Sequence, residues 1–155
     1  AALEKEIKSI NPSLEQLIKE DEKLQANYER IRSVKHVGMV AALQLMVYTH
    51  DFTRFDNAKK IASYAGVAPF AYSSGTSIRG KNQVHPMANK TLKKSLHMCA
   101  LSAIRHAGVM KDYFDRKVAE GKNKMSVINA IRNKILHIIF ACVREQRLYT
   151  CKQAA

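Results

Sequence analysis

Residues 124–147, KMSVINAIRNKILHIIFACVREQR, decide the fold class of this chain. Apolar side chains recur there at steps of three and four residues, which is the spacing of one face of an α-helix. The apolar positions are Ile128, Ile131, Ile135, Ile138, Ile139, Cys142 and Val143. A stripe of this kind is typical of a helix that packs against a hydrophobic core. The stretch therefore predicts a long core helix.

Most of the remaining chain also shows helical spacing. Two helices are predicted over residues 24–49, and a short one that Asp56 caps and Gly66 ends. Two more are predicted over 89–108 and 110–120. At 155 residues the chain has the size of one ordinary domain. We therefore predict a mainly α fold, a helical bundle with one irregular segment.

Residues 1–32 form an N-terminal helical arm with a coiled-coil-like pattern. Apolar residues alternate at steps of four and three with Asp21 skipped, namely Leu3, Ile7, Ile10, Leu14, Leu17, Leu24, Tyr28 and Ile31. The pair Asn11-Pro12 predicts that a helix restarts there, and the acidic cluster at 20–22 predicts a second break. The arm could dimerise or connect domains, and it could equally pack on its own domain.

A turn at Lys35-His36-Val37-Gly38 joins two helices in the plan of a helix-hairpin-helix. In that plan a glycine lets backbone N–H groups approach a phosphate, which makes Gly38 a candidate hairpin residue. An ordinary helical hairpin explains the turn equally well. The helix after the turn carries the apolar residues Val40, Leu43, Leu45 and Val47.

Positive charge is concentrated in the middle of the chain. Lys and Arg together number 26 against 13 acidic residues, for a formal net charge of +13. No acidic residue occurs between Asp56 and Asp112, whereas nine basic residues do. Such a segment is the electrostatic footprint of nucleic-acid binding, because phosphate contacts release counterions. The simpler alternative is a solvated basic surface.

Several other classes of protein are disfavoured. Three cysteines without a C-x-x-C spacing argue against disulfides or a zinc ribbon and predict reduced thiols in a cytosolic protein. No apolar run reaches the ~20 residues that span a bilayer, so we predict no membrane partner. The carboxylates and histidines show no metal-ligand spacing, so we predict no metal in this chain. Because the chain begins at Ala1, we expect it to be part of a longer protein.

Residues 66–90 lack helical spacing and are rich in Gly, Pro and small polar residues, which predicts a long irregular loop or a β-hairpin. Its centre, Ser73-Ser74-Gly75-Thr76-Ser77, is followed by Arg79 and Lys81. A serine there could attack phosphorus while Arg79 holds the non-bridging oxygens. Composition alone favours a turn without chemistry, because no base or metal ligand lies near in sequence.

The order of these segments resembles a known family. The resemblance runs from about Ile31 to Glu145 and is carried by Arg54-Phe55, Ala58–Pro69, Tyr72–Gly80, Asn89, Leu92–Leu96 and Ala100–Ala103. These blocks are similar to the C-terminal transposase domain of the IS116/IS110/IS902-type insertion-sequence transposases, also called DEDD transposases. The family usually has Pro-Gly where this chain has Lys35-His36. The resemblance implies that residues 33–150 are that domain.

What the resemblance implies is a DNA-binding catalytic domain that transfers phosphoryl groups in DNA transposition. The nucleophile would be Ser74, just before the glycine of the loop, with the adjacent Ser73 as its chemically equal rival. Arg79 would clamp a phosphate and Lys81 would contact the backbone. Further phosphate or DNA contacts are assigned to Gly75, Ser77, Lys90, Lys93, Lys94 and Arg105.

The resemblance also implies partners beyond this chain. These are DNA, a structured guide RNA, a homo-oligomer (dimer or tetramer), and an N-terminal RuvC-like domain whose acidic residues bind Mg²⁺. That domain is expected to be absent here, so we predict no cofactor in this chain and no activity for the isolated fragment. The implied location is the bacterial cytoplasm, at the nucleoid during transposition. The competing hypothesis is a non-catalytic helix-hairpin-helix-type module that only positions DNA or RNA.

Overall fold

The computed structural model describes residues 2–70, 73–74, 78–79, 83–84 and 86–150. This part of the chain is mainly helical, as predicted, with a few short strands. The helices are α1 (Ala2–Lys19), α2 (Glu22–Ser33), α3 (Met39–Thr49), α4 (Ala58–Tyr64), α5 (Lys90–Arg105), α6 (Val109–Ala119) and α7 (Lys124–Arg144). The strands are β1 (Pro69–Phe70), β2 (Ser73–Ser74), β3 (Ile78–Arg79) and β4 (Gln83–Val84).

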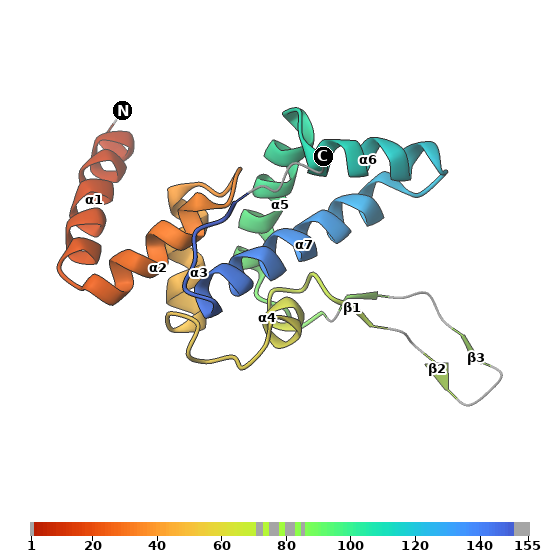
Figure 1. The fold of residues 1–155 in the computed structure, drawn as a ribbon, viewed down its shortest axis with the longest axis horizontal. Helices are drawn as coiled ribbons and strands as arrows, with labels where there is room; N and C mark the ends of the chain where they lie inside the picture. Colours follow the sequence, from red (N-terminus) through yellow and green to blue (C-terminus); the bar gives the residue numbers. More distant parts are fainter. Residues whose placement is uncertain (1, 71–72, 75–77, 80–82, 85, 151–155) are drawn as a thin grey trace.

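Helix α7 forms the centre of the hydrophobic core. It packs against α2, α4, α5 and α6, and it crosses the middle of the helical body in Figure 1. Its predicted stripe is buried, with Ile131, Ile135 and Ile139 at most 1% exposed. The periodicity of residues 124–147 therefore identified the core helix correctly.

The N-terminal arm breaks where its acidic cluster predicts. Helix α1 ends at Lys19, and Asp21 caps α2 by accepting hydrogen bonds from the backbone N–H groups of Lys23 and Leu24, at 2.9 and 3.0 Å. The predicted restart at Pro12 is wrong, because Pro12 lies inside α1. A proline removes one helical hydrogen bond at a cost of ~3 kcal/mol, which bends or weakens a helix without having to end it.

The two ends of the arm differ in their surroundings. Helix α1 contacts α2 and stands away from the helical body in Figure 1, whereas α2 also packs against α3 and α7. The predicted boundary at residue 32 thus falls at the end of a helix whose Ile31 is fully buried. In α3 the buried face is Ala41, Ala42, Leu45, Met46 and Thr49, and Val40 and Val47 are exposed.

Helix α4 is capped by Asn57. The sequence-based prediction that Asp56 caps this helix is therefore wrong. The Asn57 side chain accepts from the Lys60 backbone N–H at 3.0 Å, while Asp56 forms an exposed ion pair with Lys60. An amide oxygen serves as a cap as well as a carboxylate does, so two adjacent candidates cannot be ranked from sequence. Gly66 ends the helix as predicted, with a φ of +66°.

The described strands after Gly66, which are β1 to β4, are here called the β-finger. Strand β1 pairs antiparallel with β4, and β2 pairs antiparallel with β3. Figure 1 shows this finger projecting away from the helices, with β1 and β4 near the body and β2 and β3 at the far end. Of the two predicted possibilities, the β-hairpin is therefore the better description.

Candidate nucleic-acid interface

The candidate nucleophiles lie near the tip of the β-finger. The register pairs Ser73 with Arg79 and Ser74 with Ile78, and Ser74 is the last residue of β2. The described strands of the finger pair only with each other. Strand β2, which contains both serines, is therefore paired only within the finger, and Figure 1 places it away from the helices.

Part of the predicted site lies outside the described residues. Gly75, Ser77 and Lys81 belong to that part, so their assignments remain predictions. For Ser74 and Arg79 the structure describes the backbone alone, and their proposed chemistry rests on the sequence.

The base of the finger is fixed by close packing around Gly66. A Cβ at Gly66 would lie 2.3 Å from the Cβ of Ala88, and the φ of +66° disfavours any side chain. Val67, the next residue, is fully buried, and its carbonyl accepts from Asn129 Nδ2 of α7 at 2.9 Å. The glycine therefore allows the outgoing and returning ends of the finger to meet against α7.

The returning end is tied to α4 through Asn89. Its backbone N–H donates to the Tyr64 carbonyl at 2.8 Å, and its Nδ2 donates to the Tyr64 hydroxyl at 3.1 Å. The same side chain caps α5 by accepting from the Leu92 N–H at 3.0 Å. Arg54 lies over the rings of Tyr64 and Phe55, 4.9 and 5.4 Å from their centroids. Arg54, Tyr64 and Asn89 thus hold the base of the finger together.

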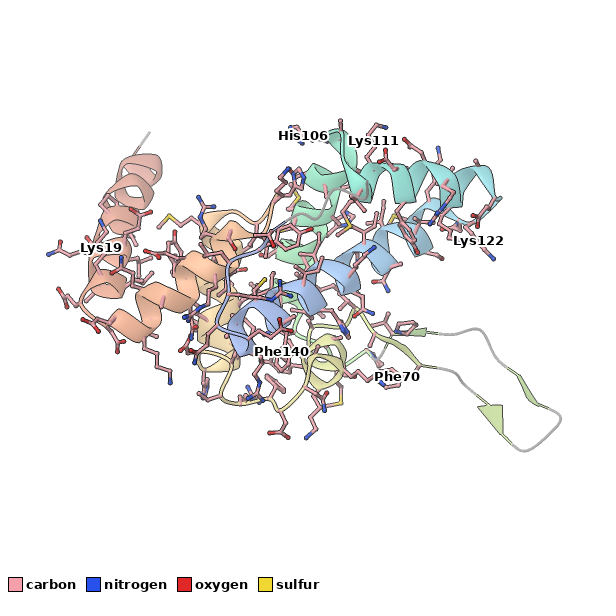
Figure 2. All side chains as sticks on the ribbon, viewed as in Figure 1. Lys19, Phe70, His106, Lys111, Lys122 and Phe140 are labelled. Atoms are coloured by element: carbon pink, nitrogen blue, oxygen red, sulfur yellow. The ribbon has the colours of Figure 1, made fainter. Side chains whose placement is uncertain are left out.

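One face of α5 is basic. Lys90, Lys94 and Arg105 are exposed and Lys93 is half-buried, while Leu92, Leu96 and Cys99 face the core. Among the described residues the ion pairs are Asp56–Lys60, Lys111–Asp115, Arg116–Glu120, Lys117–Glu120 and Glu145–Arg147. None of these pairs involves a cation of α5. The basic face is therefore available to a polyanion. In Figure 2 the labelled Phe70 marks the point where the finger leaves the helical body.

Sequence reasoning missed one buried cation, Arg132 of α7. Its side chain is only 6% exposed and its Nη2 donates to His97 Nδ1 of α5 at 2.8 Å. Its Nε is buried without a hydrogen-bond partner. Burial lowers the pKa of Arg132, and burial followed by the charge of Arg132 lowers the pKa of His97. In the sequence Arg132 stands four residues after Ile128, on the apolar stripe, but spacing alone does not distinguish a buried arginine from one at the edge of the stripe.

In the α2–α3 hairpin, His36 and not Gly38 has the unusual backbone. His36 has a φ of +69°, whereas Gly38 has an ordinary φ of −80°. A left-handed φ is uncommon for a residue with a side chain, so this turn holds His36 in a conformation that glycine would adopt more readily. Its ring stacks on His106 with centroids 5.4 Å apart.

Gly38 itself is the N-cap of α3 and has open space around it. Burial raises the pKa of the Cys99 thiol, and the Gly38 N–H facing the sulfur acts in the opposite direction. A phosphate at the hairpin would therefore have to compete with Cys99 for this N–H. An adjoining hollow of about 610 Å³ is lined by Met39, Val40, Lys94 and Met98, among others.

In the described ranges no group of three or more His, Cys, Asp or Glu side chains is placed to hold a metal ion. Helix α7 is long and apolar enough to span a bilayer, but half of that stretch is buried inside the fold, which also suits a core helix.

The sequence was then compared with known proteins. The profile of the transposase IS116/IS110/IS902 family matches residues 28–115, which include the β-finger, all of α5 and most of α6. The chain belongs to this transposase family. The match covers Tyr64, Gly66 and Asn89, the residues that fix the base of the finger.

Curated relatives of this transposase family member include proteins of mobile elements and a gene-inverting protein. A protein of insertion element IS110 of Streptomyces coelicolor is 31% identical over 81% of this chain and 31% of its own length. The pilin gene-inverting protein of Moraxella lacunata is 31% identical over 91% of this chain and 44% of its own. A protein of IS900 of Mycobacterium paratuberculosis is 26% identical over 96% and 38%. The chain thus spans less than half the length of these relatives.

Proposed function

We propose that this chain is the part of a DNA transposase that holds nucleic acid and presents Ser74 as the nucleophile. The single observation that carries the proposal is the place of Ser74 at the end of a projecting β-finger, in a chain of a transposase family. The unpaired basic face of α5 supports it, because phosphate contacts need cations that no carboxylate already neutralises.

In the proposed step the Ser74 hydroxyl loses its proton to a base outside this chain. Its oxygen bonds to the phosphorus of one DNA strand, and the bond from that phosphorus to a deoxyribose oxygen breaks. The released DNA hydroxyl takes up a proton. The strand is held as a serine phosphoester until another DNA hydroxyl attacks it. Arg79, opposite Ser73 in the register, is proposed to hold the non-bridging oxygens, with Lys81, Gly75 and Ser77 beside it.

The remaining components are proposed to come from elsewhere in the longer protein and its complex. An acidic RuvC-like domain would bind Mg²⁺, which supplies Lewis-acid chemistry to phosphoryl transfer when bound. A structured guide RNA would pair with the DNA. The complex would assemble in the bacterial cytoplasm, at the nucleoid during transposition.

Assembly into a homo-oligomer is proposed to use α1. Its Ile10 and Leu17 are 52% and 59% exposed, and a hollow of about 380 Å³ lies between α1, α2 and α3. A second copy of the arm would cover this apolar surface. Leu17→Glu should then lower the sedimentation-derived oligomer mass and leave the melting temperature unchanged, whereas an unchanged mass would exclude this surface.

The alternative function is a binding module whose finger only orders against phosphate. It shares the basic face of α5 and the hairpin, but it requires no chemistry at Ser74. The two proposals differ in whether a covalent protein–DNA adduct forms.

The deciding experiment uses the full-length transposase with guide RNA, labelled element-junction DNA and Mg²⁺, followed by a denaturing gel. Ser73→Ala, Ser74→Ala and Ser77→Ala are compared, and the two neighbours are matched controls for loss of a hydroxyl. An adduct lost only in Ser74→Ala is expected. Recombination without any adduct would reduce this chain to the positioning role, and loss only in Ser73→Ala would move the nucleophile by one residue.

A further inference from the structure

We propose that His97 and Arg132 form a phosphate-binding dyad beside the base of the β-finger, in which Arg132 holds His97 so that its Nε2–H donates to a phosphodiester. This proposal deepens the proposed function and rests on it, because it adds a binding site to the same nucleic-acid interface. The dyad itself contains neither the serines of the finger nor the lysines assigned from sequence, although Lys90 and Lys93 precede it on the same helix.

The first argument is the isolation of the Arg132 charge. At 6% exposure the guanidinium has lost nearly all its hydration, yet its described partner is a neutral imidazole and its Nε has none. Among the described ion pairs none includes Arg132. A buried cation without a counter-ion is costly, and proteins ordinarily pair such groups. An anion that binds nearby would supply the missing partner.

The second argument is the tautomer of His97. Its Nδ1 accepts from Arg132 Nη2 at 2.8 Å, so the proton of the neutral ring is on Nε2. His97 is half-buried, in contrast to Arg132. The ring is thus less buried than the guanidinium that it contacts, and its N–H donor is on the nitrogen that Arg132 does not use.

The third argument is the direction of the surrounding charge. Lys93 and Lys90 lie one and two turns before His97 along the same helix. The half-buried Lys93 has its Cδ 3.6 Å from the position that a Cβ on Gly66 would take, which places it at the base of the finger. The cations thus become more buried in the order Lys90, Lys93 and Arg132, which are exposed, half-buried and buried. With no acidic residue between positions 57 and 111, a phosphate is the partner that this arrangement favours.

The test compares Arg132→Met with Lys134→Met in the 155-residue chain. Both remove one positive charge from α7, but Lys134 is exposed and lies over the Tyr113 ring of α6. Binding of a fluorescein-labelled 30-base single strand and a 30-base-pair duplex is measured by anisotropy over a series of KCl concentrations. Thermal unfolding of each variant is measured in parallel.

Arg132→Met is expected to bind about tenfold more weakly, with a log–log salt slope smaller by about one, while Lys134→Met changes affinity less than threefold. The melting temperature of Arg132→Met should not fall, because a buried unpaired charge has been replaced by an apolar group of similar length. Loss of stability with wild-type binding would overturn the proposal and make Arg132 a packing residue. Unchanged binding would also exclude a phosphate and favour a carboxylate of another segment as the partner.

If Arg132→Met does not fold, His97→Phe takes its place in the same titration. It keeps the Arg132 charge but removes the Nε2–H donor, so wild-type affinity in that variant would overturn the proposal. The wild-type chain separates the two levels of inference. A salt slope near zero for the wild type would refute nucleic-acid binding and the dyad together, whereas a steep slope shared by all variants would refute the dyad alone.

Discussion

Replacing Gly66 by alanine should destabilise the fold by about 2–5 kcal/mol. Two separate costs contribute. A residue with a side chain pays ~1–2 kcal/mol for the left-handed conformation, and φ here is +66°. The new Cβ would also lie 2.3 Å from the Ala88 Cβ, and overpacking of this kind costs ~1–3 kcal/mol. The loss is a large fraction of the 5–15 kcal/mol that holds an ordinary domain together.

Guanidinium unfolding followed by circular dichroism at 222 nm measures this cost, and Gly121→Ala is the matched control. Gly121 has a φ of +81° but nothing within 4 Å of an added Cβ, so only the ~1–2 kcal/mol conformational cost should appear. In the double variant Gly66→Ala/Ala88→Gly the clash is removed, and the two changes should couple favourably by ~1–3 kcal/mol. Equal losses for Gly66→Ala and Gly121→Ala, without coupling to Ala88, would refute the packing argument.

Three further perturbations have expected outcomes. Gly38→Ala should change the unfolding free energy by less than about 1 kcal/mol, because φ is −80° and the surrounding space is open; a loss above 2 kcal/mol would contradict this. Asn129→Ala should cost about 1 kcal/mol by removing the bond to the Val67 carbonyl, as denaturant titration would show. Burial lowers the pKa values of His36 and His97, so the unfolded chain binds protons more readily. Stability should be complete above pH 6.5 and fall below it, less so in His36→Asn and His97→Gln; a flat profile between pH 7.5 and 5.5 would contradict this.

The parts of the fold that could be predicted from sequence are those that periodicity controls. The stripes of α5 and α7 repeat every three to four residues, so Leu92, Leu96 and Ile135 could be assigned to the core. In α3 nearly every residue is apolar, and spacing could not show that Val47 would be exposed. Pro12 and the cap at Asn57 depend on single hydrogen bonds, to which a pattern averaged over several residues is insensitive.

The candidate site also contains residues that could be predicted from sequence and one that could not. Ser74 and the lysines of α5 could be selected because their residue types carry the chemistry, and the family resemblance marked the serine. Arg132 could not be selected, because a lone arginine on an apolar stripe is usually placed at a helix edge, where its charge reaches water. Only the packing of α5 against α7 shows that it is buried and bonded to His97.

The distribution of acidic residues determines where positive charge remains uncompensated on the molecule. Asp56, at one end of the basic segment, and Asp115, just past the other end, form ion pairs with Lys60 and Lys111, each four residues away. Such local pairs neutralise charge at the two ends of the segment and leave α5 and the base of the finger uncompensated. Because exposed pairs of this kind add little stability, their placement matters more for where positive potential remains than for folding. The same placement leaves the sequence of the β-finger without an acidic residue, in keeping with the proposal that the base for Ser74 comes from outside this chain.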